Sequence, residues 1–236
     1  MTPRMCVALD VSDIMEAMDL VERLRGTVRI FKVGARLFSH AGPAAIMALR
    51  SRDLDAFVDT KLNDIPSVTA EAAAAMASHG ASYITIHALA GPDAVAATRE
   101  RLSRYPEPPK LLAVTILTSI DGETLDRMGI KARPEELVSS LARMAVEAGA
   151  DGVVCSAMEL PRIRPLLPKE TIFVTPGIRP AGAAHADQRR VASPALAVKN
   201  GASIIVVGRP ILTASDPKAA AGEILAEILK ASESSR

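Results

Sequence analysis

Short β-branched runs alternate with longer segments of helical period along the chain, and this alternation constrains the fold more than any other feature. The runs that we expect to form strands are residues 5–10, 28–34, 54–61, 82–88, 111–118, 151–156, 171–177 and 203–208. Helical segments separate them, among others at 14–26, 35–51, 67–80, 93–105 and 134–150. Strands separated by helices must run parallel. Eight such units predict an α/β fold, a single (β/α)8 TIM barrel.

The length of the chain fits one such barrel. The 236 residues are enough to bury a full hydrophobic core without metals or disulfides. No linker rich in Pro, Gly or Ser divides the sequence. We therefore expect one catalytic domain over residues 1–236, with a frayed tail at 231–236.

Composition excludes several classes of function. Lys and Arg number 28 against 27 Asp and Glu, so the formal charge of +1 gives no reason to expect nucleic acid or an anionic membrane as a partner. No stretch approaches the ~18 apolar residues of a membrane span, and no apolar leader is evident. Cys6 and Cys155 lie in separate apolar runs and form no CxxC pair. These features predict a soluble protein of the reducing cytoplasm.

Polar residues stand at or just past the carboxyl ends of the predicted strands, where a barrel gathers its catalytic groups. In chain order they are Asp10, Lys32, Asp59, Lys61, His87, Thr118, Ser156, Arg179, Gly208 and Arg209. Ionised groups inside a barrel lose hydration and persist only when they are paired or bind something. This ring of polar residues therefore predicts a functional site at the end of the barrel where the carboxyl ends of the strands meet.

The third strand carries the densest group of charges. Asp59 and Lys61 are two residues apart, so on a strand they share one face with Phe57, and we expect both to point into the barrel. Asp64 lies past the strand, just before Ile65-Pro66, where a helix should begin. Two interpretations of Asp64 stand side by side, an N-cap of that helix and a catalytic carboxylate.

Four other residues of the ring have structural alternatives. Lys32 could be a solvated lysine beyond a strand, although its surroundings, Phe-Lys-Val-Gly, favour a position in a functional site. Asp10 could cap the first helix. His87 is interpreted as a structural hydrogen-bonding residue, because no carboxylate is evident beside it. Thr118 fits either a turn or a ligand contact.

The last two strands end in TPGIRP (175–180) and VVGRP (206–210). Loops at these two positions hold phosphate in many barrels, through backbone N–H groups and an arginine fork. Arg179 and Arg209 could instead pair with surface carboxylates, but the glycine beside each favours phosphate. Two connections, 119–134 and 177–194, are longer than a barrel needs, and we expect both to serve the site.

These motifs together resemble the bacterial branch of the orotidine 5′-monophosphate decarboxylase family, from Ala-Leu-Asp at 8–10 to VVGRPI at 206–211. The family signature D-x-K-x-x-D-I-P stands here at residues 59–66, paired with Lys-Val-Gly at 32–34. The resemblance implies decarboxylation of orotidine 5′-monophosphate to uridine 5′-monophosphate in pyrimidine synthesis, without metal or cofactor.

The resemblance also implies roles for individual residues. Lys32, Asp59, Lys61 and Asp64 would form a charged tetrad, with Asp64 contributed to the neighbouring subunit of a homodimer. Asp10 and Lys32 would contact the ribose, and Thr118 would line the pyrimidine pocket. The phosphate would be held by Arg179, Gln188, Gly208 and Arg209. Val68 stands where the family usually has threonine, so a hydroxyl contact there would fall to Ser67 or Thr69.

Two other functions compete with this one. A Mg²⁺-dependent sugar-phosphate decarboxylase or synthase of the same superfamily shares D-x-K-x-x-D but carries glutamate at the position of Lys32, and a lysine there would repel Mg²⁺. A non-catalytic nucleotide-binding barrel would need the phosphate arginines but not the four charges.

Overall fold

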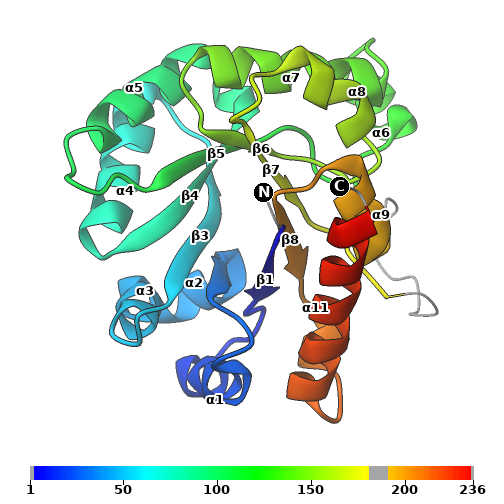
Figure 1. Ribbon diagram of the computed structural model, residues 1–236. Helices are drawn as coiled ribbons and strands as arrows, with labels where there is room; N and C mark the ends of the chain where they lie inside the picture. Colours follow the sequence, from blue (N-terminus) through cyan, green and yellow to red (C-terminus); the bar gives the residue numbers. More distant parts are fainter. Residues whose placement is uncertain (1–2, 181–190, 235–236) are drawn as a thin grey trace.

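The computed structural model describes residues 3–180 and 191–234, within which eight parallel strands close into one barrel (Figure 1). The strands are β1 (Arg4–Ala8), β2 (Ile30–Gly34), β3 (Asp55–Leu62), β4 (Ala81–His87), β5 (Lys110–Val114), β6 (Gly152–Val154), β7 (Ile172–Thr175) and β8 (Ile204–Val207). Each strand pairs with the next, and β8 closes on β1. The predicted (β/α)8 TIM barrel is confirmed.

Helices surround the barrel and lie against the outer side of its strands (Figure 1). They are α1 (Ile14–Leu24), α2 (Ala35–Ala41), α3 (Pro43–Arg50), α4 (Pro66–Ser78), α5 (Pro92–Leu102), α6 (Gly122–Arg127), α7 (Pro134–Glu147), α8 (Leu160–Ile163), α9 (Pro194–Asn200), α10 (Arg209–Leu212) and α11 (Pro217–Ser234), with 3-10 turns η1 (Ala88–Ala90) and η2 (Arg164–Leu166). In the part of the chain described, no helix is long and apolar enough to cross a membrane.

The strands face two hydrophobic cores, because successive side chains of a strand point to opposite faces. Phe31, Val33 and Val58 pack outward against the helices. Cys6, Phe57 and Tyr83 belong to a separate cluster that fills the barrel interior. The cluster leaves the carboxyl ends of the strands to other side chains, so a polar site can form above it.

Several sequence expectations need correction. The predicted helix at 35–51 is two helices, α2 and α3, because Gly42 adopts φ 56° and breaks the run. The long connection 119–134 is not all loop, since it contains α6. The tail expected to fray continues α11 as far as Ser234, and residues 235–236 lie outside the described part of the chain.

Two of the structural alternatives, helix caps at Asp10 and at Asp64, are excluded. The N-cap of α1 is Asp13, whose carboxylate accepts from the backbone N–H groups of Met15 and Glu16, and not Asp10. The N-cap of α4 is Ile65, and Asp64 instead accepts a hydrogen bond from the Ile65 N–H at 2.7 Å. Neither Asp10 nor Asp64 caps a helix. Helix capping therefore does not explain why a carboxylate stands at these two positions.

Candidate active site

The carboxyl ends of the strands surround a cavity of about 840 Å³. Of the residues predicted for the site, those that line it are Asp10, Lys32, Asp59, Lys61, Thr118, Arg179, Gly208 and Arg209. They come from strands or strand exits on most sides of the barrel, so the fold brings together groups that are up to 199 positions apart in the sequence. Gln188 lies outside the described residues.

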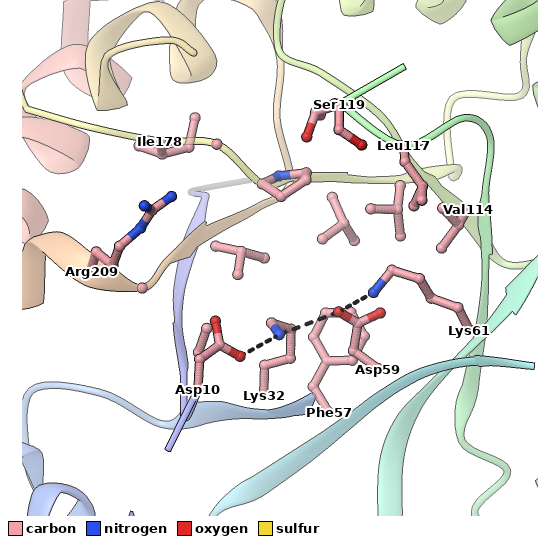
Figure 2. A pocket seen from close by; sticks show the side chains of 18 of the residues that line it. Asp10, Lys32, Phe57, Asp59, Lys61, Val114, Leu117, Ser119, Ile178 and Arg209 are labelled. Carbon is pink, nitrogen blue, oxygen red and sulfur yellow. Dashed lines mark hydrogen bonds and ion pairs between the residues drawn. The ribbon is translucent and has the colours of Figure 1, made fainter. Parts of the chain in front are cut away.

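Four charged side chains form a continuous row along one side of this cavity (Figure 2). Lys32 Nζ lies 3.3 Å from Asp10 Oδ1 and 3.3 Å from Asp59 Oδ2. Lys61 Nζ lies 3.0 Å from the same Asp59 Oδ2. The row therefore alternates in sign from Asp10 to Lys61, and each charge is compensated by a neighbour.

The middle of the row is shielded from water, and its ends are open. The side chains of Lys32 and Asp59 are 12% and 11% exposed, against 52% for Asp10 and 35% for Lys61. Burial acts to lower the pKa of Lys32, but the carboxylates of Asp59 and Asp10 outweigh burial and raise this pKa above its usual value. Lys32 is therefore held as an ammonium at the floor of the cavity.

The backbone of β3 is irregular where the row is built. Between the pairs Val58–Ile84 and Leu62–Ile86 the register with β4 shifts, and Lys61 has a φ of 52°. Bulges of this kind re-aim side chains next to active sites. The expectation that Asp59 and Lys61 point the same way is met, but through a distorted strand and not through regular alternation.

Thr85 of β4, which the sequence did not single out, contacts both of these residues. Its Oγ1 accepts from the Lys61 backbone N–H at 2.9 Å and lies 3.1 Å from Asp59 Oδ1, to which it donates. The signal was present in the alternation of Tyr83, Thr85 and His87 along β4, because residues at this spacing share a strand face. The hydroxyl of a buried threonine can also form a hydrogen bond with a backbone carbonyl. The sequence alone therefore did not show that Asp59 and Lys61 are the partners of Thr85.

Two further residues support the Asp10 end of the row. Gly34 leaves room for it, because a Cβ at this position would lie 2.9 Å from Lys32 Nζ and 3.0 Å from Asp10 Oδ1. Arg36, also missed from the sequence, lines the cavity and donates to the Asp10 backbone carbonyl at 3.1 Å and to Ser12 Oγ at 2.9 Å. Sequence spacing gave no sign of this, since α2 folds back over the β1–α1 turn.

The exits of β7 and β8 form another side of the cavity. Arg209 begins α10 and lies on the opposite side of the cavity from Lys61 (Figure 2). The Arg179 backbone N–H donates to the Ala192 carbonyl at 3.0 Å, which fixes the start of the β7 loop. Arg179 and Arg209 therefore line a part of the cavity that is separate from the ammonium of Lys61.

Not every polar residue at the rim faces the cavity. The Nδ1 atom of His87 accepts from the Leu89 N–H at 3.3 Å, so the structural interpretation of His87 is confirmed. Burial, and then the nearby Lys61 ammonium, lower the His87 pKa, and this favours the neutral ring that the hydrogen bond requires. Ser156 is buried and its hydroxyl accepts from the Met158 N–H in the turn before α8.

Asp64 is exposed and does not line the cavity of its own chain. Near it, the side chains of Ile65 and Val68 are also exposed, at 63% and 46%. Thr69 is buried, and its hydroxyl donates to the Pro66 carbonyl at 3.0 Å. Thr69 is therefore not placed to replace the hydroxyl that Val68 lacks, whereas Ser67 is exposed.

The donor set of the cavity is poor for metal ions. Among residues 3–180 and 191–234, no group of three or more His, Cys, Asp or Glu side chains is arranged to hold one. The carboxylates of Asp10 and Asp59 already face the Lys32 ammonium, which occupies the position between them. The arrangement instead suits an anionic substrate that meets fixed ammonium and guanidinium groups.

Comparisons with known proteins agree with this geometry. Residues 3–224 match the model of the orotidine 5′-phosphate decarboxylase / HUMPS family. The orotidine 5′-phosphate decarboxylase of Nitrosococcus oceani is 44% identical over 95% of this chain and 97% of its own length, and that of Moorella thermoacetica is 45% identical over 95% and 92%. The crystal structure of orotidine 5′-phosphate decarboxylase from Lactobacillus acidophilus superposes with a TM-score of 0.85 at 37% identity, covering 96% of this chain and 99% of that one. A barrel with this charged row, matched over nearly its whole length, belongs to the orotidine 5′-phosphate decarboxylase / HUMPS family.

Proposed function

We propose that this chain decarboxylates orotidine 5′-monophosphate to uridine 5′-monophosphate in pyrimidine synthesis, as one catalytic domain and without metal or cofactor. The observation that carries the proposal is the row Asp10–Lys32–Asp59–Lys61 in a cavity that also holds Arg209. The relatives named above are orotidine 5′-phosphate decarboxylases. Within the family, Lys32 argues against the magnesium-dependent alternative, because its ammonium occupies the place between the two carboxylates that a cation would need.

The chemistry requires stabilisation of localised charge. When the bond from C6 of the pyrimidine to its carboxylate breaks, CO2 leaves and the electron pair stays on C6 in the ring plane. A preorganised ammonium in a water-poor cavity stabilises such a carbanion far better than water does. We assign this role to Lys61, which then transfers a proton from Nζ to C6 and regains one from solvent.

Asp59 sets the position of that ammonium and adds a second effect. Its Oδ2 atom contacts both Lys61 and Lys32, so the three groups hold one another in register. A carboxylate of the substrate placed near Asp59 would be repelled, and this repulsion disappears as CO2 leaves. Part of the rate enhancement would then come from a destabilised ground state.

The rest of the substrate binds away from the reacting carbon. We assign the phosphate to Arg179, Gln188, Gly208 and Arg209, the ribose hydroxyls to Asp10 and Lys32, and the pyrimidine to the side of the cavity lined by Thr118. Binding energy from a remote phosphate can organise the groups around C6.

We further propose a two-fold homodimer in which Asp64 enters the neighbouring subunit's cavity. Asp64 is exposed, does not face its own cavity and does not cap α4. The exposed apolar side chains of Ile65 and Val68 lie beside it, as expected at a surface that a second copy covers. A cytoplasmic location fits this pathway and the burial of both cysteines.

A spectrophotometric assay of the purified chain tests the activity. We expect orotidine 5′-monophosphate to be converted to uridine 5′-monophosphate at the same rate before and after treatment with EDTA. Loss of turnover in EDTA, with recovery on adding Mg²⁺, would identify the magnesium-dependent class instead. Tight binding of the nucleotide without turnover would identify a binding protein.

A further inference from the structure

The distorted segment of β3 faces a single residue of β4. Val58 pairs with Ile84 and Leu62 pairs with Ile86, so Asp59, Thr60 and Lys61 together lie opposite Thr85. Extra residues in one strand interrupt the ladder of backbone hydrogen bonds. Lys61, with its φ of 52°, also adopts a conformation that is unfavourable for a residue with a side chain. Something must stabilise this segment if Lys61 is to stay in place.

Thr85 supplies what the interrupted ladder lacks. Its Oγ1 atom accepts from the Lys61 N–H at 2.9 Å, in the place of a backbone carbonyl of β4. The same oxygen donates its hydrogen to Asp59 Oδ1 at 3.1 Å. A hydroxyl can accept and donate at once, which neither an apolar side chain nor an ammonium can do. The side chain is fully buried, so water does not compete for its hydroxyl, and the nearby Val58 carbonyl oxygen lies farther from Oγ1, at 3.5 Å, than Asp59 Oδ1 does.

These contacts close a ring around Lys61. Thr85 holds the Lys61 backbone directly, and it holds the Lys61 ammonium through Asp59, whose other oxygen lies 3.0 Å from Lys61 Nζ. Thr85 itself does not line the cavity, so it reaches the substrate only through these neighbours. We infer that Thr85 is a positioning residue, which fixes both the backbone and the charged end of Lys61. The inference rests on the function proposed above.

Removal of the hydroxyl at constant volume should misplace Lys61 without emptying the core. We expect Thr85→Val to lower kcat by about 10- to 100-fold, the range that small misplacements of catalytic groups produce. The KM for orotidine 5′-monophosphate should change little, because the proposed phosphate and ribose contacts lie on other strands. Thr85→Ser keeps the donor and acceptor and should stay within about threefold of the wild-type kcat.

Thr175 offers a matched control. It is also a fully buried threonine of a barrel strand, but its hydroxyl donates to the backbone carbonyl of Ile204, at 3.5 Å. Thr175→Val should therefore leave kcat close to the wild-type value. Thermal unfolding of all variants shows whether a loss of activity follows a loss of structure. If Thr85→Val does not fold, Thr85→Ala provides a second variant without the hydroxyl.

Hydrogen exchange at the Lys61 backbone amide tests the geometry without any substrate. We expect slow exchange in the wild type and in Thr85→Ser, and exchange at least tenfold faster in Thr85→Val. Rapid exchange in the wild type, or wild-type kcat in Thr85→Val, would overturn the inference. An inactive wild type with a protected Lys61 amide would instead contradict the proposed function and leave the contact of Thr85 with Lys61 established.

Discussion

Lys61 Nζ lies 3.0 Å from Asp59 Oδ2, and this contact is made from a residue whose backbone is left-handed, with a φ of 52°. A regular strand would carry the two residues about 6.6 Å apart along its axis. The irregular register of β3 thus places the ammonium beside the carboxylate. The strained backbone of Lys61 thus occurs together with the Lys61–Asp59 contact that the proposed reaction needs.

The left-handed conformation of Lys61 predicts an unusual response to glycine. Lys61→Gly should be more stable than Lys61→Ala by about 1–2 kcal/mol, because a Cβ disfavours this conformation. Lys110, on the regular strand β5, is the control: there the glycine variant should be less stable than the alanine variant by about 0.5–1 kcal/mol. Denaturant unfolding measures both differences. The same sign at both positions would contradict the left-handed backbone.

Gly34→Ala should damage the site more than the fold. The new Cβ would lie 2.9 Å from Lys32 Nζ, so the end of this flexible side chain has to shift, whereas the surrounding backbone does not. The contacts of Lys32 with Asp10 and Asp59 would then be lost, and we expect kcat/KM to fall at least tenfold, about 1.4 kcal/mol of transition-state stabilisation.

Gly222→Ala is the control for that variant. Gly222 lies inside α11, where a Cβ would meet no atom within 4 Å. This substitution should leave kcat/KM unchanged and raise stability by about 0.5–1 kcal/mol, because alanine is the better helix former. Unchanged kinetics in Gly34→Ala would show that Lys32 does not need its present position.

Arg209→Ala should affect only the phosphorylated substrate. Loss of charge-assisted hydrogen bonds to phosphate costs about 1.5–3 kcal/mol, which corresponds to a rise in KM of roughly 10- to 100-fold. Turnover of the nucleoside orotidine, which has no phosphate, should barely change. Steady-state kinetics on both substrates measure this difference. Equal losses of activity on the nucleotide and on the nucleoside would place Arg209 away from the phosphate.

Asp64 provides a test of the shared site. Lys61→Ala and Asp64→Ala, unfolded and refolded together, should recover about a quarter of wild-type activity, because half the dimers are mixed and half of their sites carry both groups. Each variant refolded alone should remain inactive. If mixed dimers form but activity is only the average of the two variants, Asp64 serves its own subunit.

The sequence was sufficient for the barrel and for most of the cavity, because strand periodicity and polar strand ends are local signals. It was not sufficient for the break at Gly42, since glycine within a helical pattern is compatible with either one helix or two. The bulge at Lys61 and the role of Thr85 depend on pairing between β3 and β4, which no single segment encodes. Arg36 was missed for the same reason, because its partners Asp10 and Ser12 belong to another strand exit.

Hydrogen exchange at C6 of uridine 5′-monophosphate tests most directly whether Lys61 stabilises a carbanion there. In D2O the wild-type protein, saturated with this nucleotide, should replace the C6 hydrogen with deuterium, because removal of that proton generates the same carbanion from the product side. The exchange is followed by NMR of the nucleotide. We expect Lys61→Ala, although folded and saturated, to show no exchange above the rate in buffer. Exchange by Lys61→Ala at the wild-type rate would contradict the assignment of Lys61 as the group that stabilises the carbanion at C6.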